Sequence, residues 1–342
     1  MHFFYVFTNS PGEVFGWVHP LCRRLTKSFE SVSISIFLTP CQYATGEEAR
    51  VAASFPGVKA VYSPSQTLKH LFSTTEQFST GTVFFMGGDP MHAKRFSKKL
   101  GARLVGYFNR KVSSDGFDFL IFKSKDIDLM AEDLVPSPID DRQGLVLLPG
   151  SRPEHLDIAL PMMIEMATCY SDVTVMVSPF TSEKQLMMFE SLYPDTVFQR
   201  MADVNDLSKY KYALTIPGTN TMQLAYLGIP FLMILPTHDS RILRLDGFLG
   251  LLLYLPVFGR LLKFLILYLK VSKNSLYALP NQAFGYAVCP ELVGRFSMDR
   301  ANFELKQLIN KDISEYEAIV EELGQLSTHK SALDHLIDYL RG

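Results

Sequence analysis

The sequence predicts an α/β protein made of two doubly wound domains, each a parallel sheet with helices on both faces. Short apolar runs alternate with stretches of helical spacing along most of the chain. A length of 342 residues suits two ordinary domains. A charged, Pro-containing segment at 135–143 separates two series of runs. We therefore expect domains at 1–140 and 141–342, facing each other across a cleft.

The predicted strands are short runs rich in β-branched and aromatic residues. In the first domain they lie at 3–7, 32–38, 60–62, 82–86, 104–107 and 119–122, with helices between them such as 18–25 and 92–100. In the second domain strands are predicted at 145–148, 173–177, 196–198, 212–216 and 231–235, and helices at 156–169, 183–192, 204–208 and 221–227. Ligands of such sheets bind at the carboxyl ends of the strands, so the turns after strands are the places to seek a site.

Composition and charge exclude several classes of protein. Hydrophobic residues make up 47% and charged residues 20%, which is typical of a folded chain. A net charge of −2 gives no general attraction to nucleic acid, so we expect no such partner. The four cysteines have neither metal-binding nor disulfide spacing, so we expect no metal cluster, no disulfide framework and a reducing compartment. We also expect no bound metal and no cofactor. The N-terminus lacks the basic region of a secretion signal, which favours a cytoplasmic location.

Two turns in the first domain carry candidate catalytic residues. The turn at 8–16 contains Gly12, where a backbone without Cβ can approach a ligand, and Glu13, which we expect at the mouth of the cleft. Glu13 can also merely favour the dipole of the following helix. Asp89 follows the strand at 82–86 and can act as a general base toward a sugar hydroxyl. The same Asp, followed by Pro90, suits a helix N-cap, and one residue can do both.

The strongest local signal is a loop in the second domain that joins a buried strand to a long helix. It contains Gly150, Ser151 and Arg152. A guanidinium group together with the free N–H groups of a helix start suits a phosphate. The alternative is a surface ion pair of Arg152 with Glu154 or Asp157.

A second loop of this domain follows the strand at 212–216. Its glycine turn and small polar residues suit a diphosphate, and a glutamine one turn later can bond a ribose hydroxyl. The residues are Gly218, Thr219, Asn220, Thr221 and Gln223. Thr219 or Asn220 can instead serve only as the helix cap.

The segment at 247–269 is almost continuously apolar and long enough to span a bilayer. Pro256, Arg260 and Lys263 interrupt it, and it lies inside the second domain. We therefore predict an insertion at about 246–272 that docks on a membrane surface without crossing it. An internal apolar hairpin is the alternative.

Five segments together resemble the lipid-A-disaccharide synthase family of GT-B glycosyltransferases: PGEVFGW, GGDP, LLPGSRPEHL, PGTNTMQLAYLGIP and SLYALPNQAFG. The resemblance implies transfer of an acylated glucosamine from a UDP-linked donor to a lipid-linked acceptor sugar, at the cytoplasmic face of a bacterial inner membrane. It implies that Arg152 and the loop at 218–221 bind the UDP diphosphate. It also makes Asp89 a candidate base and assigns Asn281, on the acceptor side of the cleft, to a shared Leu-Pro-Asn element.

The sequence departs from the family pattern at three positions. Phe15 and Trp17 replace the Ser and Asp of the family loop, and Gln223 replaces a Glu. Two other functions therefore stay open. One is a UDP-sugar epimerase or hydrolase on the same fold, which needs no lipid acceptor, and the other is a membrane-associated relative without catalysis.

Overall fold

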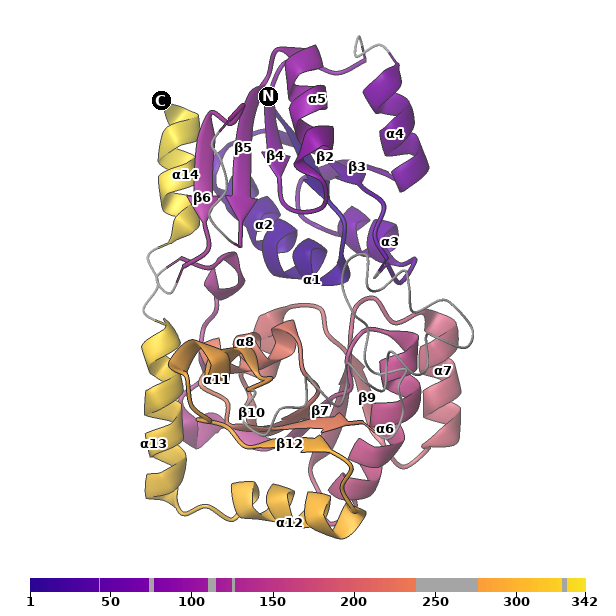
Figure 1. The fold of residues 1–342 in the computed structure, drawn as a ribbon, viewed down its shortest axis with the longest axis vertical. Coiled ribbons are helices and arrows are strands. Elements are labelled where there is room, and N and C mark those ends of the chain that lie inside the picture. The colour runs from indigo at the N-terminus through magenta and orange to yellow at the C-terminus, as the bar shows by residue number, and fades with distance from the viewer. Residues whose placement is uncertain (43, 74–76, 110–114, 125–126, 238–275, 328–330) are drawn as a thin grey trace. The chain divides into compact units, whose positions relative to one another are not determined.

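The structure is a computed structural model that describes residues 1–342 except 43, 74–76, 110–114, 125–126, 238–275 and 328–330 (Figure 1). The chain forms two compact units. The first contains Met1–Asp133 and Thr328–Gly342, and the second contains Leu134–Ser327. The apolar segment at 247–269, predicted to dock on a membrane, lies outside the described residues.

The first unit is built on a parallel six-stranded sheet in the order β3-β2-β1-β4-β5-β6. Its strands are β1 (His2–Thr8), β2 (Val32–Leu38), β3 (Val58–Tyr62), β4 (Thr82–Phe85), β5 (Arg103–Phe108) and β6 (Phe119–Phe122). Its main helices are α2 (His19–Ser28), α3 (Glu48–Ala53), α4 (Pro64–Phe72), α5 (Pro90–Leu100) and α14 (Ala332–Arg341). Because β1 lies between β2 and β4, the turns that follow these three strands gather at one edge of the sheet.

Local sequence signals fix the ends of the helices that cross over this sheet. α5 begins at an Asp89 N-cap, whose carboxylate accepts a hydrogen bond from the N–H of Met91 at 2.9 Å. It ends at Gly101, which has a left-handed φ of 61°. α4 begins with a capping box between Ser63 and Gln66.

Stacked aromatic rings fill the core of the first unit. Phe7 of β1 lies parallel to Phe37 of β2, with 4.8 Å between the ring centroids. Phe96 of α5 packs on both rings, at 5.4 and 4.9 Å. All three are fully buried, so the core joins α5 to the strands whose ends carry the candidate residues of this unit.

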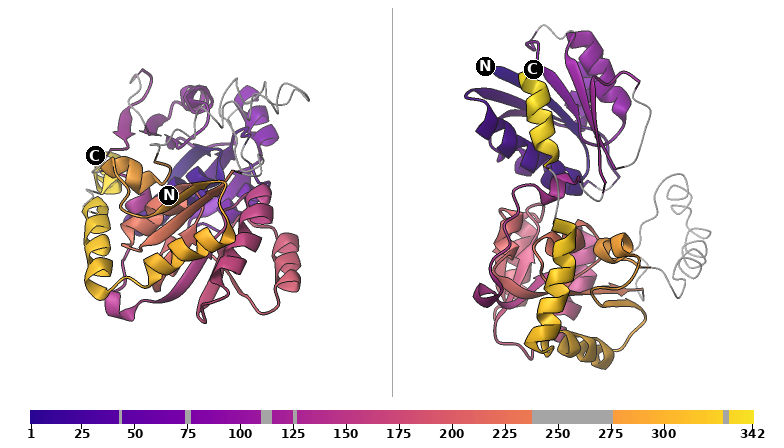
Figure 2. Two further views of the ribbon diagram at one scale, coloured as in Figure 1. Left: turned by 60° about the horizontal axis from the view of Figure 1, so that its bottom comes forward. Right: turned by 90° about the vertical axis from the view of Figure 1, so that its left-hand side faces the viewer.

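The last helix, α14, belongs to the first unit and lies beside β6 (Figures 1 and 2). The ring of Tyr339 stacks on that of Phe119 at 4.5 Å. The carboxylate of Glu132 accepts hydrogen bonds from the Ser331 hydroxyl at 2.8 Å and from the N–H of Leu333 at 3.2 Å. This placement differs from the expected division, which ended the first domain at 140 and gave the C-terminal helices to the second.

The second unit holds another parallel six-stranded sheet, in the order β12-β11-β10-β7-β8-β9. Its strands are β7 (Gln143–Leu148), β8 (Val173–Val177), β9 (Val197–Arg200), β10 (Tyr210–Thr215), β11 (Phe231–Pro236) and β12 (Glu291–Gly294). Its helices are α6 (Pro153–Ala167), α7 (Glu183–Leu192), α8 (Thr219–Tyr226), α11 (Leu279–Phe284), α12 (Met298–Ile309) and α13 (Ile313–Gly324).

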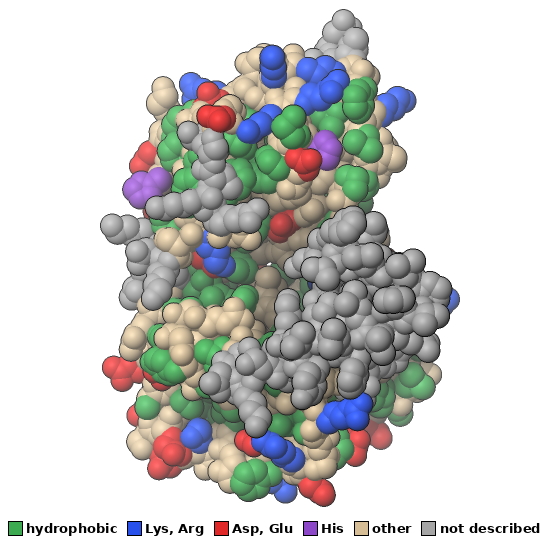
Figure 3. All heavy atoms as spheres, viewed as in Figure 1, with side chains coloured by type: hydrophobic (Ala, Val, Ile, Leu, Met, Phe, Trp, Pro, Cys, Tyr) green, Lys and Arg blue, Asp and Glu red, His purple; other side chains and the backbone are tan. Residues whose placement is uncertain are grey.

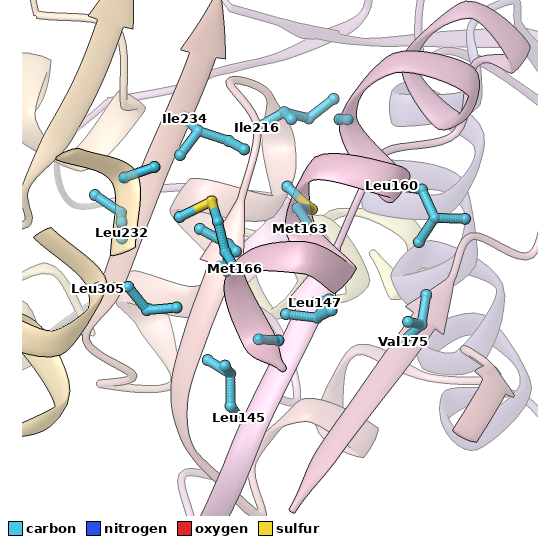
Figure 4. Close-up of a cluster of buried hydrophobic side chains, with 14 of the residues drawn as sticks. Leu145, Leu147, Leu160, Met163, Met166, Val175, Ile216, Leu232, Ile234 and Leu305 are labelled. Atoms are coloured by element: carbon cyan, nitrogen blue, oxygen red, sulfur yellow. The ribbon is translucent and has the colours of Figure 1, made fainter. Parts of the chain in front are cut away.

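Helix α6 covers one face of the second sheet (Figure 4). Met163 and Met166 of α6 are buried against apolar side chains of the strands, including Leu147 of β7 and Ile234 of β11. Unbranched Met side chains adapt to irregular gaps between a helix and a twisted sheet. The packing holds the start of α6 at the end of β7, where the strongest sequence signal lies.

All eleven predicted strands are confirmed within a few residues of their predicted ends. β12 was not predicted, and the segment at 204–208 is a 3-10 helix, Val204–Leu207. The helix predicted at 18–25 is preceded by a π-helix, Val14–Val18. Among the described residues, no helix combines the length and apolar character that a membrane crossing needs.

Candidate functional site

The first group of candidate residues lies where β1 ends. Ser10 caps the short helix α1 (Pro11–Glu13), whose partly buried middle residue is Gly12. The Ser10 hydroxyl accepts a hydrogen bond from the N–H of Glu13 at 3.3 Å. The Glu13 carboxylate accepts one from the N–H of Ser10 at 3.2 Å. This reciprocal capping box directs the Glu13 side chain back over the turn.

Gly87, which follows β4, makes room for the Glu13 carboxylate. A Cβ atom at Gly87 would overlap both carboxylate oxygens of Glu13. Gly87 also has a φ of 142°, which side chains with a Cβ rarely adopt. The turns after β1 and β4 are therefore in direct contact, and glycine is needed there for both space and backbone conformation.

Burial raises the pKa of Glu13, although hydrogen bonds from Ser10 and the backbone of Asn9 oppose the shift. Desolvation penalises the charged form of a carboxyl group, which makes its carboxylate the stronger base. Glu13 thus has the chemistry of a proton acceptor while still serving as a helix cap.

Two polar residues that the sequence analysis did not single out lie at the same edge. A Cβ atom at Gly88 would overlap Oγ1 of Thr39 and lie 3.3 Å from Nδ2 of Asn9. Within the described part of the chain, the buried Oδ1 of Asn9 and Oγ1 of Thr8 have no hydrogen-bond partner. Buried polar atoms are normally bonded, so this edge can accept a polar ligand. Their position in the sequence could have identified them, because Asn9 directly follows β1 and Thr39 directly follows β2.

Asp89 is exposed and caps α5 through one carboxylate oxygen. Its role as a cap is therefore present in the structure, and its second oxygen forms no hydrogen bond with the described residues. Of the two predicted catalytic carboxylates, Glu13 has the more desolvated environment.

The two aromatic departures from the family loop pack inside the first unit. Phe15 is buried and stacks on His19 with 5.4 Å between ring centroids. Trp17 meets the ring of Tyr107 edge to face at 5.0 Å. Both belong to the π-helix Val14–Val18. Phe15 therefore acts in packing and is not presented to an acceptor.

The second group of candidate residues lies at the carboxyl edge of the sheet in the second unit. β7 and β10 are paired in parallel, with Leu148 opposite Thr215, so the loops that follow them are neighbours. Gly150 has a φ of 95°, and a Cβ atom there would lie 2.6 Å from Cδ1 of Ile216. The two loops therefore pack directly on each other, which requires glycine at 150.

Arg152 is the N-cap residue of α6 and is partly buried, as is Ser151. The Arg152 carbonyl accepts hydrogen bonds from the N–H groups of His155 and Leu156, both at 3.0 Å. These bonds start a helix of 15 residues directly after Arg152. A Cβ at Gly150 would lie 3.4 Å from Nδ1 of His155, a residue that the sequence analysis did not single out. The Arg152 guanidinium and the helix start together form a region of positive potential suited to an anion.

Gly218 is the N-cap of α8, is exposed and has a φ of 148°. A Cβ atom there would meet no described atom within 4 Å. Thr219 and Asn220 follow in the first turn and are partly buried. The loop thus presents bare backbone and two small polar side chains at the start of a helix, an arrangement that suits a phosphate.

Thr221 and Gln223 differ from the expectation that they contact a ligand. Thr221 is fully buried, and its hydroxyl donates to the carbonyl of Gly218 at 2.8 Å and accepts from the N–H of Leu279 at 3.1 Å. Gln223 is only 3% exposed, so little of its side chain can reach a ribose. Thr221 therefore fixes the shape of the loop, because it also ties α8 to Leu279, the first residue of α11.

Asn281 is also a structural residue, which corrects its predicted place on the acceptor side. Its side chain is fully buried. Nδ2 donates to the carbonyl of Cys289 and to Glu291, both at 2.8 Å. Oδ1 accepts from the N–H groups of Val288 at 2.9 Å and Cys289 at 3.1 Å. With both donors and both acceptor positions used, the amide has no capacity left for a ligand.

Glu291 of β12 completes this network, and the sequence analysis missed it. Its carboxylate accepts from the N–H of Tyr277 at 2.9 Å and of Ala278 at 2.8 Å, as well as from Asn281. The residues before α11 are thereby held against β12. The described residues contain no group of three or more His, Cys, Asp or Glu side chains that could hold a metal ion.

Comparison with known proteins identifies similar folds but no related sequence. The sequence matches no protein-family model and no curated protein. Among solved structures it is similar to UDP-GlcNAc 2-epimerase from Neisseria meningitidis bound to UDP-GlcNAc, with a TM-score of 0.52, 13% identity and full coverage of both chains. It is also similar to the spinosyn rhamnosyltransferase SpnG, with a TM-score of 0.51, 12% identity and full coverage of both chains. The glycosyltransferase VinC in complex with DTDP gives 0.51 and 12%, with 99% of this chain and all of that chain covered.

The chain has the GT-B fold. The two parallel six-stranded sheets and these structural neighbours confirm the predicted fold class of two Rossmann-like α/β domains. At 12 to 13% identity the likeness concerns the fold alone.

Proposed function

We propose that the chain is a glycosyltransferase that uses a UDP-linked sugar donor. The observation that carries the proposal is the pair of glycine turns at Gly150 and Gly218, on adjacent strands and each followed by a helix. Two helix starts and the Arg152 guanidinium at one sheet edge suit the two phosphates of a nucleoside diphosphate. The same groups stabilise the negative charge that develops on UDP as the sugar leaves.

The first unit supplies the proton acceptor in this proposal. A hydroxyl of the acceptor sugar loses its proton to Glu13, its oxygen bonds to the anomeric carbon, and the bond from that carbon to the UDP oxygen breaks. Glu13 is favoured over Asp89 because burial raises its pKa. Comparing Glu13→Gln with Asp89→Asn decides between them, since the base is the residue whose amide variant loses turnover while its affinity for UDP is kept.

The donor and acceptor classes come from the resemblance. The segments LLPGSR and LPN support an acylated glucosamine as donor sugar and a lipid-linked sugar as acceptor. Such an acceptor lies in a membrane, and the proposal therefore includes peripheral or monotopic attachment at the cytoplasmic face of the inner membrane through residues 247–269. Attachment there would allow the acyl chains to stay out of water during transfer.

A UDP-sugar epimerase is the second candidate, because the Neisseria enzyme is an epimerase with the same fold. The test is incubation of the purified chain with UDP-diacylglucosamine and an acylated sugar 1-phosphate. A glycosyltransferase gives a disaccharide and one UDP per disaccharide. An epimerase gives an isomerised UDP-sugar without UDP release, and a hydrolase gives UDP and free sugar. If none of these products forms, the result would favour the alternative of a relative without catalysis.

A further inference from the structure

We propose that helices α4 and α5 of the first unit form a surface that docks on a bilayer containing anionic lipids. This α4–α5 surface consists of Leu68, Lys69, Phe72, Met91, Lys94, Arg95, Lys98 and Lys99. The inference is independent of the proposed reaction and concerns a different part of the chain from residues 247–269.

Three large apolar side chains of this surface are exposed to solvent. Phe72 is 70% exposed, Met91 64% and Leu68 37%. Leu68 and Phe72 are four residues apart in α4, so they lie on one face of that helix. Met91 lies four residues before Arg95 on one face of α5, and Arg95 lies against the Phe72 ring. The three apolar side chains are therefore grouped, unlike the scattered apolar residues that are normal on protein surfaces.

The charged residues of the two helices are all basic. Neither α4 nor α5 contains Asp or Glu. Lys69, Arg95, Lys98 and Lys99 are exposed, and none of them forms a salt bridge within the described part of the chain. Figure 3 shows Lys and Arg side chains gathered over this end of the first unit, with hydrophobic side chains beside them. Because the whole chain has a net charge of −2, this concentration of positive charge is local.

Contacts between the helices hold the cations next to the apolar side chains. The guanidinium of Arg95 lies 4.3 Å from the centroid of the Phe72 ring and donates to the carbonyl of Leu71 at 3.1 Å. Lys99 donates to the same carbonyl at 3.1 Å and also to that of Ser73. The end of α4 is thereby fixed beside α5, and the exposed Phe72 is flanked by positive charge.

A lipid surface suits this combination better than an acidic protein does. The apolar side chains can enter the boundary of the acyl chains, while the long Lys and Arg side chains reach anionic headgroups. Each basic residue near an anionic surface strengthens binding about fivefold. A folded partner would have to match the shape of a convex helix pair, which a fluid bilayer does not.

The test is flotation of the full chain with vesicles of phosphatidylcholine alone or with phosphatidylglycerol added. One variant carries Phe72→Ser, Lys69→Gln and Lys98→Gln. The matched control carries Phe303→Ser, Arg300→Gln and Lys306→Gln on α12, where Phe303 is 57% exposed and acidic residues balance the basic ones. All three proteins keep residues 247–269, so any binding through that segment is the same in each.

We expect the partition of wild type and control to rise with phosphatidylglycerol, and that of the α4–α5 variant to be at least tenfold weaker. The variant should keep the thermal unfolding transition of wild type and its sugar transfer to a detergent-dispersed acceptor, because its substitutions are on the surface. Equal partition of variant and control would overturn the proposal. So would binding of wild type to vesicles that does not depend on phosphatidylglycerol. Failure of sugar transfer in wild type would contradict the proposed function and leave the vesicle result standing.

Discussion

Two features of Glu13 act on its charge in opposite directions: its hydrogen bonds favour the carboxylate, and its burial favours the neutral acid. Its carboxylate completes a capping box with Ser10, and it is buried against Gly87 where the charged form is penalised. Gln fits the same capping box, because its side-chain oxygen accepts the same hydrogen bond. Glu13→Gln therefore removes the charge and keeps the cap.

We expect Glu13→Gln to lower turnover about 10²- to 10⁴-fold, the usual contribution of a general base. In wild type, turnover falls as the pH drops through the pKa of Glu13, which burial holds above the ordinary value of 4.5. The measurement is a pH–rate profile of sugar transfer for both proteins. A variant with the turnover of wild type would show that Glu13 is only a cap.

The same variant has a defined effect on stability. Because the folded state holds the Glu13 proton more tightly than the unfolded chain, this stabilisation is complete at acid pH and is lost as the pH rises through the raised pKa. Gln does not ionise, so the variant does not lose stability in this way as the pH rises. We expect urea unfolding to show the variant at least as stable as wild type at pH 7, with a smaller difference at pH 5.

Candidate residues could be predicted by type and position, but their roles could not. Asn281 and Gly218 both follow from motifs, yet Asn281 is fully buried and Gly218 is exposed. Nothing in the local sequence distinguishes an Asn that binds a ligand from one that bonds Cys289 and Glu291. The contact of Glu13 with Gly87 joins turns far apart in the chain, so only the sheet order reveals it.

At the scale of elements, the network of Asn281 and Glu291 holds the segment before α11 in place. Asn281→Asp keeps the shape but replaces two donors with an acceptor beside the Glu291 carboxylate. We expect a loss of about 3–5 kcal/mol in the free energy of unfolding at neutral pH, because a buried charge is left without a partner. Lower pH should reduce the loss, since a protonated Asp can donate once more.

Urea unfolding measures this loss, with Gln282→Glu as the control. Gln282 is the next residue, is exposed, and donates to the carbonyls of Leu276 and Tyr277. Its change should cost no more than about 1 kcal/mol. Equal costs for the two variants would mean that the Asn281 network does not stabilise the unit.

Continuous apolar runs made most strands predictable, whereas β12 was missed for a physical reason. Its four residues, ELVG, include only two apolar side chains, too few to show a pattern. The strand forms because its backbone pairs in parallel with the neighbouring strand β11. α7 has its predicted bounds, and the structure shows a capping box between Ser182 and Gln185 at its start.

At the scale of the whole molecule, the chain leaves the first unit after Asp133 and returns to it at Thr328. The apolar face of α14 indicates that this helix packs against a core. It does not indicate which of the two sheets the helix packs on. Leu336 is fully buried in this helix, and α14 contacts α2. The expected division therefore failed for the C-terminal residues, because the pairing of distant segments has no local signal.

Leu336→Ala tests the assignment of α14. We expect a loss of about 2–5 kcal/mol, the usual cost of such a cavity. Native-state hydrogen exchange should show faster exchange in the strands of the first unit and unchanged exchange in β7, β8 and β10. Faster exchange in the second unit alone would contradict the assignment.

In the proposed function, the paired loops of the second unit bind UDP. The most direct measurement is calorimetric titration of UDP into wild type, Arg152→Ala and the control Lys209→Ala, whose exposed lysine precedes β10 at the opposite edge of the same sheet. Loss of a charge-assisted contact of about 1.5–3 kcal/mol predicts roughly 10- to 150-fold weaker binding for Arg152→Ala. The control should bind like wild type. No binding of UDP by wild type, or equal affinity in all three proteins, would contradict the account.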